Sequence, residues 1–206
     1  MIAAALVLAS LATGDVDLVA AAIERYRTVE AYQVTLKSSY GDQSDIIRYS
    51  YKKPGFVRMD FVQPHKGAVL IYSPLTKKVR LWPFGSGFFS LTLSPENRLV
   101  LSPTGHRVDR SDIGVLLHNV KTLQRSGRTT VVGEEIVAGK KTTRLVVAGT
   151  ATFVVDNVHR YELWLDHVTR LPLKAVSRDL RDDIIETVVM DDLNVNIKLG
   201  DELFNP

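Results

Sequence analysis

The chain contains no cysteine among its 206 residues. This absence excludes a disulfide framework, a thiol nucleophile, a cysteine-ligated zinc or iron–sulfur site, and an acylated cysteine that would anchor a lipoprotein. A strong charge of one sign is also lacking. The chain has 26 Lys and Arg residues against 23 Asp and Glu residues, a net charge of +3 that is too small and too scattered to predict a nucleic-acid-binding surface. Hydrophobic residues make up 45%, which is typical of an ordinary globular domain.

Motifs for catalysis and metal binding are missing as well. The chain has five histidines: His65, His106, His118, His159 and His167. None of them pair at metal-ligand spacing. Adjacent acidic residues such as Glu134 and Glu135 fall on a predicted strand, where neighbouring side chains point to opposite faces and cannot share a site. We therefore predict neither an enzyme nor a metal or cofactor site.

The first twelve residues are uncharged and mostly apolar, with small residues at Ser10 and Ala12. This pattern resembles the hydrophobic region and cleavage site of a secretory signal, and it predicts export with a cut after Ala12. The alternative is that residues 2–11 form the first turns of an N-terminal helix. A membrane anchor is not expected, because spanning needs about 20 apolar residues and the run stops at Thr13. Residues 13–206 are expected to form one soluble domain in the periplasm.

Two segments have the spacing of an amphipathic helix. The first covers residues 15–29, with Asp15 as its expected N-cap. The second covers residues 111–124, with Ser111 as its expected N-cap. The apolar stripe of the second helix consists of Ile113, Leu116, Leu117, Val120 and Leu123.

Most of the remaining chain alternates apolar and polar residues with the period of a strand. The predicted strands are residues 32–40, 45–52, 56–62, 68–73, 78–82, 129–137, 141–148, 161–166, 171–179 and 184–191. Turn signals such as Gly41-Asp42 and Pro54-Gly55 separate them at short intervals. A meandering antiparallel sheet follows, because parallel pairing would require long crossovers. The sequence contains no repeat or linker, which favours a single domain.

The expected fold class is mainly β, within α+β: a strongly curved antiparallel sheet that forms an incomplete barrel. Several strands are apolar on both faces, so something must cover the second side. The available cover is the two or three helices and the apolar loop of residues 83–105, which would be costly to expose. A sheet closed in this way either packs solid or encloses a hydrophobic ligand. The residues alone do not distinguish these outcomes.

Three stretches resemble the LolA-like family of periplasmic lipoprotein and lipid carriers. They are residues 53–59, residues 67–73 followed by 78–83, and residues 163–166 followed by 171–174. Further features follow in the same order as in the family: Glu186, residues 192–196 and Leu203-Phe204. The resemblance therefore covers most of residues 52–204. It implies an incomplete barrel with a helical lid. It also implies a monomeric carrier that shields a lipid or lipoprotein acyl chain during outer-membrane lipoprotein or lipid transport, with partners in the inner and outer membranes.

The carrier interpretation predicts an apolar cavity and a polar latch. The cavity is predicted to be lined by Tyr49, Met59, Trp82, Phe84, Phe88, Phe89, Leu91, Ile113, Leu116, Leu117 and Trp164. Lys53 and Arg58 are predicted to contact a headgroup. The best-known carriers of the family have arginine where this chain has Lys53, and a lysine cannot make the forked contacts of a guanidinium.

Two other functions are compatible with the same fold. One is an envelope-stress sensor or regulatory module that binds a protein partner, although the chain is too short for the second domain that such sensors usually carry. The other is an enzyme on this scaffold, since one pigment-biosynthesis enzyme is similar in fold. The carrier remains the main prediction.

Overall fold

The computed structural model describes residues 17–85 and 87–205. The predicted signal segment and Asp15 lie outside this part. The helices are α1 (Leu18–Arg27) and α2 (Ile113–Arg125). The strands are β1 (Ala31–Tyr40), β2 (Gln43–Lys52), β3 (Phe56–Gln63), β4 (Val69–Ser73), β5 (Lys78–Trp82), β6 (Leu91–Leu93), β7 (Gly127–Val137), β8 (Lys140–Gly149), β9 (Arg160–Asp166), β10 (Pro172–Arg178) and β11 (Ile184–Val195). Short 3₁₀ turns lie at Arg98–Val100, Val108–Arg110 and Asp201–Leu203.

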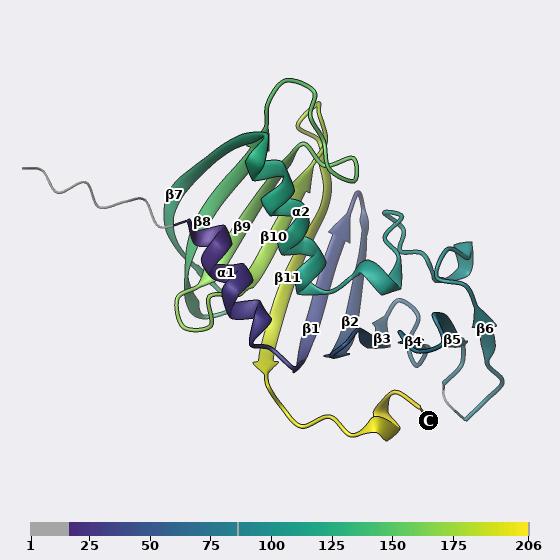
Figure 1. Cartoon of the computed structure of the whole chain (residues 1–206). Coiled ribbons are helices and arrows are strands. Elements are labelled where there is room, and N and C mark those ends of the chain that lie inside the picture. The colour runs from purple at the N-terminus through teal and green to yellow at the C-terminus, as the bar shows by residue number, and fades with distance from the viewer. Residues whose placement is uncertain (1–16, 86, 206) are drawn as a thin grey trace, which may run out of the picture.

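All eleven strands form one antiparallel sheet in the order β6-β5-β4-β3-β2-β1-β11-β10-β9-β8-β7. The chain meanders from β1 to one edge and later from the other edge back to β11. The pairing of β1 with β11 therefore joins the two halves of the chain. Figure 1 shows that the sheet is strongly curved and open. The predicted fold class is confirmed: a mainly β, curved antiparallel sheet that does not close into a barrel.

Both helices pack on the concave face of the sheet, over the half that contains β7 to β11 (Figure 1). Residues at helical spacing bury one side of each helix against alternate residues of the strands. The core between these layers includes Val19, Ala22, Leu117, Val120, Leu123, Leu145, Val147, Leu163 and Leu173. The other half of the concave face is not filled by helices.

The helix starts differ from the predicted ones by one or two residues. Asp17 is the N-cap of α1, and its carboxylate accepts from the backbone N–H of Ala20 at 3.0 Å. Asp112 is the N-cap of α2, because its extended backbone directs its carboxylate to the N–H of Gly114 at 2.7 Å. The predicted cap, Ser111, instead donates to the carbonyl oxygen of Val108 at 2.7 Å.

The C-terminal segment covers part of the convex face. After β11 it turns back toward the half of the sheet that contains β3 to β5 (Figure 1). Phe204 is buried there with Val69, Ile71 and Trp82. These strands are apolar on both faces, and this segment covers their convex face. Within residues 17–85 and 87–205, no helix is long and apolar enough to span a bilayer.

Candidate ligand-binding cavity

A cavity of about 900 Å³ lies on the concave face of the sheet, beside the region that the helices fill. Its sheet wall comes from alternate residues, because side chains two apart on a strand share a face. These wall residues include Tyr32, Val34, Leu36, Ile47, Tyr49, Met59, Phe61, Leu70, Leu81, Val188 and Met190. The volume lies in the range of pockets that hold small-molecule ligands.

The opposite wall is formed by the chain that leads into α2 and by the first turns of that helix. Residues 99–103, 106–108 and 110–112 line the cavity, and we refer to residues 99–112 as the roof segment. Ile113, Leu116 and Asn119 continue this wall along α2. Part of the predicted covering loop, residues 83–105, therefore does cover an apolar space.

Three tyrosine hydroxyls hold the start of α2 against the sheet and α1. Tyr26 donates to Asp112 at 2.8 Å, Tyr32 accepts from the backbone N–H of Ile113 at 3.2 Å, and the hydroxyl of Tyr49 lies 3.1 Å from that of Ser111. The rings of Tyr32 and Tyr49 are stacked with centroids 5.8 Å apart. Burial raises the pKa of all three phenols, so they stay protonated.

Polar side chains line the part of the cavity next to β9, β10 and β11. The imidazole of His106, in the roof segment, lies 3.4 Å from the carboxylate of Glu186 on β11. The hydrogen bond to Glu186 raises the pKa of His106, although burial opposes the shift. Burial raises the pKa of Tyr161, another wall residue, to about 12. The cavity is therefore apolar over most of its wall and polar on one side.

Arginines of the roof segment also reach the cavity. Arg110 lies 3.5 Å from Asp156, which also accepts from the amide of Asn119 at 3.0 Å. Arg107 is paired with Asp109 at 2.6 Å. The sequence does not predict these two arginines at the cavity, because they lie in an irregular segment with no periodicity that could assign their direction.

Four of the predicted cavity residues line the cavity: Tyr49, Met59, Ile113 and Leu116. Leu117 does not, because it points into the core between α2 and the sheet and is only 1% exposed. Leu116 and Leu117 belong to the same apolar stripe, and only the packing of α2 decides which one reaches the cavity.

Two predicted cavity tryptophans lie on the convex face instead. Leu81 points into the cavity, so its neighbour Trp82 points outward, into the cluster covered by the C-terminal segment. Leu163 belongs to the concave core, so Trp164 faces the other way. Its indole N–H donates to Glu135 at 2.6 Å.

The predicted apolar residues of the β5–β6 connection are also absent from the cavity wall. Phe84 and Phe88 are each 67% exposed, Phe89 is 59% exposed, and Leu91 lies on the edge strand β6. The connection extends outward from the sheet edge, so only the roof segment turns back over the concave face.

The two predicted latch residues contact other parts of the chain. Lys53 donates to the carbonyl oxygen of Arg27 at 2.8 Å and to Glu30 at 2.9 Å, a position that favours a cation because it is the C-terminal end of α1. Arg58 bonds to Asp60 and donates to the carbonyl oxygen of Leu203 at 2.9 Å, on the convex face. Neither side chain lines the cavity.

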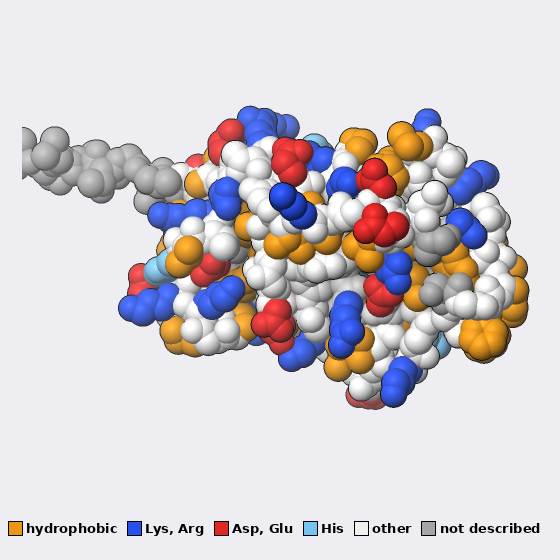
Figure 2. Space-filling view, turned by 90° about the horizontal axis from the view of Figure 1, so that it is seen from below, with side chains coloured by type: hydrophobic (Ala, Val, Ile, Leu, Met, Phe, Trp, Pro, Cys, Tyr) orange, Lys and Arg blue, Asp and Glu red, His pale blue; other side chains and the backbone are white. Residues whose placement is uncertain are grey.

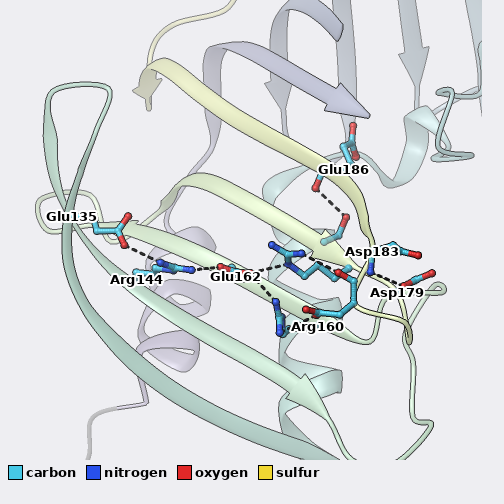
Figure 3. Close-up of polar contacts among 10 residues, drawn as sticks. Glu135, Arg144, Arg160, Glu162, Asp179, Asp183 and Glu186 are labelled. Atoms are coloured by element: carbon cyan, nitrogen blue, oxygen red, sulfur yellow. Dashed lines mark hydrogen bonds and ion pairs between the residues drawn. The ribbon is translucent and has the colours of Figure 1, made fainter. Parts of the chain in front are cut away.

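A second polar cluster lies on the convex face and is separate from the cavity. Glu162 accepts from Arg144 at 2.5 Å and from Arg178 at 2.9 Å, and it lies 3.3 Å from Arg160 (Figure 3). Burial alone would raise the pKa of Glu162, but the hydrogen bonds from Arg144 and Arg178 hold it below its usual value. This ion-pair network links β8, β9 and β10. No group of three metal-ligating side chains occurs in the part of the chain that the structure describes.

Comparison with known proteins places these features in a family. The family model described as the MucB/RseB N-terminal domain matches residues 92–206. Comparison with curated protein sequences gives no match.

Several solved structures share the fold at low sequence identity. The Pseudomonas aeruginosa MucA/MucB complex aligns with a TM-score of 0.56 and 18% identity, over 91% of this chain and 59% of that one. An uncharacterized conserved protein from Thermus thermophilus aligns with a TM-score of 0.55 and 12% identity, over 91% of both chains. Mycobacterium tuberculosis lipoprotein LppX aligns with a TM-score of 0.52 and 10% identity, over 90% of this chain and 98% of that one.

The chain thus spans less than two thirds of the matched chain in the MucA/MucB complex. At these identities the structural likenesses establish the fold alone. The fold that the family resemblance implied, an open curved sheet with helices over its concave face, is confirmed. Because the family model covers more than half of its residues, the chain belongs to the MucB/RseB N-terminal domain family.

Proposed function

We propose that this protein is an exported binding protein that shields a lipid or lipoprotein acyl chain in the cavity, as a carrier in outer-membrane lipoprotein or lipid transport. The observation that supports this function is the cavity itself, about 900 Å³ of space against a wall of aliphatic and aromatic side chains. Removing an acyl chain from water stabilises a complex by about 0.8 kcal/mol for each buried CH₂ group. A wall of this kind therefore favours long aliphatic ligands.

The polar side of the cavity suits a ligand with a headgroup. Arg110 is about half exposed and lies 3.5 Å from Asp156, a loose pair that can exchange partners. His106 and Arg107 also line the cavity. A phosphate or carboxylate headgroup next to the roof segment would meet the guanidinium of Arg110, while its acyl chain extends along the concave face. Arg110 replaces Lys53 and Arg58 in the headgroup role.

The first experiment compares adjacent residues of α2. Leu116→Asp places a carboxylate on the cavity wall, and we expect the affinity for a fluorescent fatty acid to fall at least about tenfold, with native circular dichroism. Leu117→Asp places the same group in the packed core and is expected to unfold the domain. His118→Asp, on the exposed side of α2, is the matched control and should change neither property. Unaltered uptake by a folded Leu116→Asp variant would contradict the proposal.

A second candidate is a regulatory module that binds a protein partner. Membership of the MucB/RseB N-terminal domain family favours it, as does the likeness to a chain of the MucA/MucB complex. Native mass spectrometry of protein purified from its own periplasm separates the two functions. A bound mass of a lipid or acylated peptide supports the carrier, whereas a stoichiometric polypeptide without an acyl group supports the regulatory module.

Export is the remaining part of the proposal. The protein from an envelope fraction should begin near Thr13, because the apolar segment with small residues at Ser10 and Ala12 is a cleavable signal. N-terminal sequencing measures this directly. Recovery of intact Met1 in the cytosol would contradict export and weaken the carrier function.

A further inference from the structure

The connection between β5 and β6 carries three exposed phenylalanines. Phe84 and Phe88 are each 67% exposed and Phe89 is 59% exposed. The rings of Phe84 and Phe89 meet edge to face with centroids 6.0 Å apart. We refer to these three residues as the Phe cluster. Figure 2 shows hydrophobic side chains gathered at the end of the molecule where β5 and β6 lie. Contiguous exposed aromatic side chains of this kind mark an interaction surface, unlike single exposed apolar residues.

The surroundings of the Phe cluster are cationic. A Cβ added to Gly85 would lie 3.6 Å from the carbonyl oxygen of Gly67, so the β3–β4 loop with exposed Lys66 runs beside the cluster. A guanidinium nitrogen of Arg80 lies 3.5 Å from the hydroxyl of Ser90, which directly follows Phe89. Both cations have no acidic neighbour in sequence.

The acidic residues of this region are sparse. Between Asp60 and Asp109 the chain has a single acidic residue, Glu96, against six lysines and arginines. The carboxylate of Glu96 is already paired with Arg107 at 2.7 Å. The stretch of chain that carries the Phe cluster therefore has a positive net charge, which is complementary to an anionic surface.

The Phe cluster also adjoins the cavity. Pro83, which directly precedes Phe84, lines the cavity, and so do Pro64 and His65 of the β3–β4 loop. A surface that contacts the Phe cluster would therefore also lie close to this side of the cavity.

We propose that the Phe cluster docks the protein on an anionic lipid bilayer, with the aromatic rings at the level of the headgroups and Lys66 and Arg80 against lipid phosphates. Aromatic rings favour the boundary between headgroups and acyl chains, and each nearby cation adds about 1 kcal/mol of attraction to an anionic leaflet, a factor of about five in binding. This inference rests on the proposed carrier function and extends it. Docking would bring the cavity to the membrane, so that a lipid could transfer without crossing water.

The geometry of the sheet edge argues for a bilayer over an added strand. Strand β6 has three residues, too short an edge for a stable additional strand. The Phe cluster extends beyond that edge, where a deformable surface can surround all three rings. The Phe cluster could also contact a second copy of the chain, and a concentration-dependent dimer would reveal that contact.

The test is co-sedimentation of the full chain with vesicles of phosphatidylcholine and phosphatidylglycerol in equal amounts, and with phosphatidylcholine alone. We expect binding to the anionic vesicles that weakens as salt is added, because the Debye length falls. The double variant Phe88→Ser/Phe89→Ser should lower the partition coefficient at least about tenfold. Leu75→Ser is the matched control, since Leu75 is 78% exposed but lies in the turn at the other end of β5.

The electrostatic part is tested in the same way. Lys66→Gln should reduce binding to anionic vesicles about fivefold and leave binding to neutral vesicles unchanged. Lys77→Gln, an exposed lysine at the other end of β5, should have little effect because the length of that strand separates it from the cluster. Equal effects of the two substitutions would overturn the assignment of Lys66 to the docking surface.

Other outcomes separate docking from the carrier function. No sedimentation of the wild-type chain with anionic vesicles, or equal sedimentation of the Phe88→Ser/Phe89→Ser variant, overturns docking. A concentration-dependent dimer that the double variant abolishes, without vesicle binding, assigns the cluster to a second copy and also overturns it. Fatty-acid uptake in solution without vesicles should be unchanged in the double variant. Absence of that uptake in the wild type contradicts the carrier and leaves the docking measurement valid on its own.

Discussion

Replacement of Glu162 by glutamine tests how much the convex ion-pair network contributes to the stability of the sheet. The side chain of Glu162 is only 5% exposed and contacts Arg144, Arg160 and Arg178 within 3.3 Å. Glutamine keeps the size of the side chain but removes its charge. Three guanidinium groups would then lie together with no buried carboxylate to balance them.

The expected cost follows from the burial of the four side chains. Breaking a buried ion pair by removing one partner typically destabilises a protein by about 3–5 kcal/mol. The arginine side chains are between 23% and 31% exposed, so water can solvate them in part. We therefore expect Glu162→Gln to lower the free energy of unfolding by about 2–4 kcal/mol, and Tm by roughly 5–15 °C for a chain of this size.

The measurement is urea unfolding followed by circular dichroism. Glu135→Gln is the control, because its carboxylate also contacts Arg144, at 3.1 Å, but is 42% exposed. We expect that control to cost less than about 1 kcal/mol. Because the folded-state pKa of Glu162 lies below its usual value, its contribution is complete above that usual value and is lost as the pH falls through the folded pKa. If Glu162→Gln costs no more than Glu135→Gln near neutral pH, the buried network does not have the stabilising role assigned to it.

Three further predictions concern the roof segment and the start of α2. The raised pKa of His106 means that its pair with Glu186 stabilises the roof at pH values below the usual histidine pKa, and that this contribution is lost as the pH rises through the raised value. Amide hydrogen exchange of the roof segment should therefore be faster at pH 8 than at pH 5, after correction for intrinsic rates, and His106→Gln should remove the difference. Asp112→Ala should destabilise the protein by about 2–3 kcal/mol in urea unfolding, since it removes the α2 N-cap and the acceptor of the Tyr26 hydroxyl. Gly114→Ala should cost about 1–3 kcal/mol by the same measurement, because a Cβ there would lie 2.4 Å from the Tyr26 ring.

Each of these predictions has a result that would contradict it. If amide hydrogen exchange of the roof segment has the same pH dependence in the wild type and in His106→Gln, the His106–Glu186 pair does not stabilise the roof segment. A cost of Asp112→Ala that is the same in a Tyr26→Phe background would mean that the contact with Tyr26 adds nothing. A neutral Gly114→Ala would show that the Tyr26 ring moves aside without loss.

The alternation of residues along the chain determined most of the sheet. Strands such as β5 and β9 have a clear period of two. Local pattern therefore predicts each of them as a strand that pairs antiparallel with the strand next to it along the chain. Strand β6 was missed, because its three residues lie within a stretch rich in Gly, Pro and Phe that predicts a loop. It exists because β5 offers an unpaired edge next to it.

Periodicity also identified residues that face together, but it could not say what each face meets. Tyr49, Met59, Ile113 and Leu116 were predicted at the cavity and lie there. Trp82 and Trp164 were also predicted at the cavity, but their neighbours Leu81 and Leu163 are the residues that face the cavity and the core. The C-terminal segment covers Trp82, and that contact joins residues more than a hundred positions apart.

What the sequence determined by itself is therefore local: most of the strands, both amphipathic helices and the antiparallel pairing of successive strands, since hydrophobic period and turn residues act over a few positions. The tertiary structure decided which face of the sheet is concave and which residues of the α2 stripe reach the cavity. It also decided that Lys53 donates to the last turn of α1 and does not contact a ligand in the cavity. It also placed His106 opposite Glu186 and left the Phe cluster exposed. These features depend on sheet curvature and on contacts between distant segments, which no local pattern encodes.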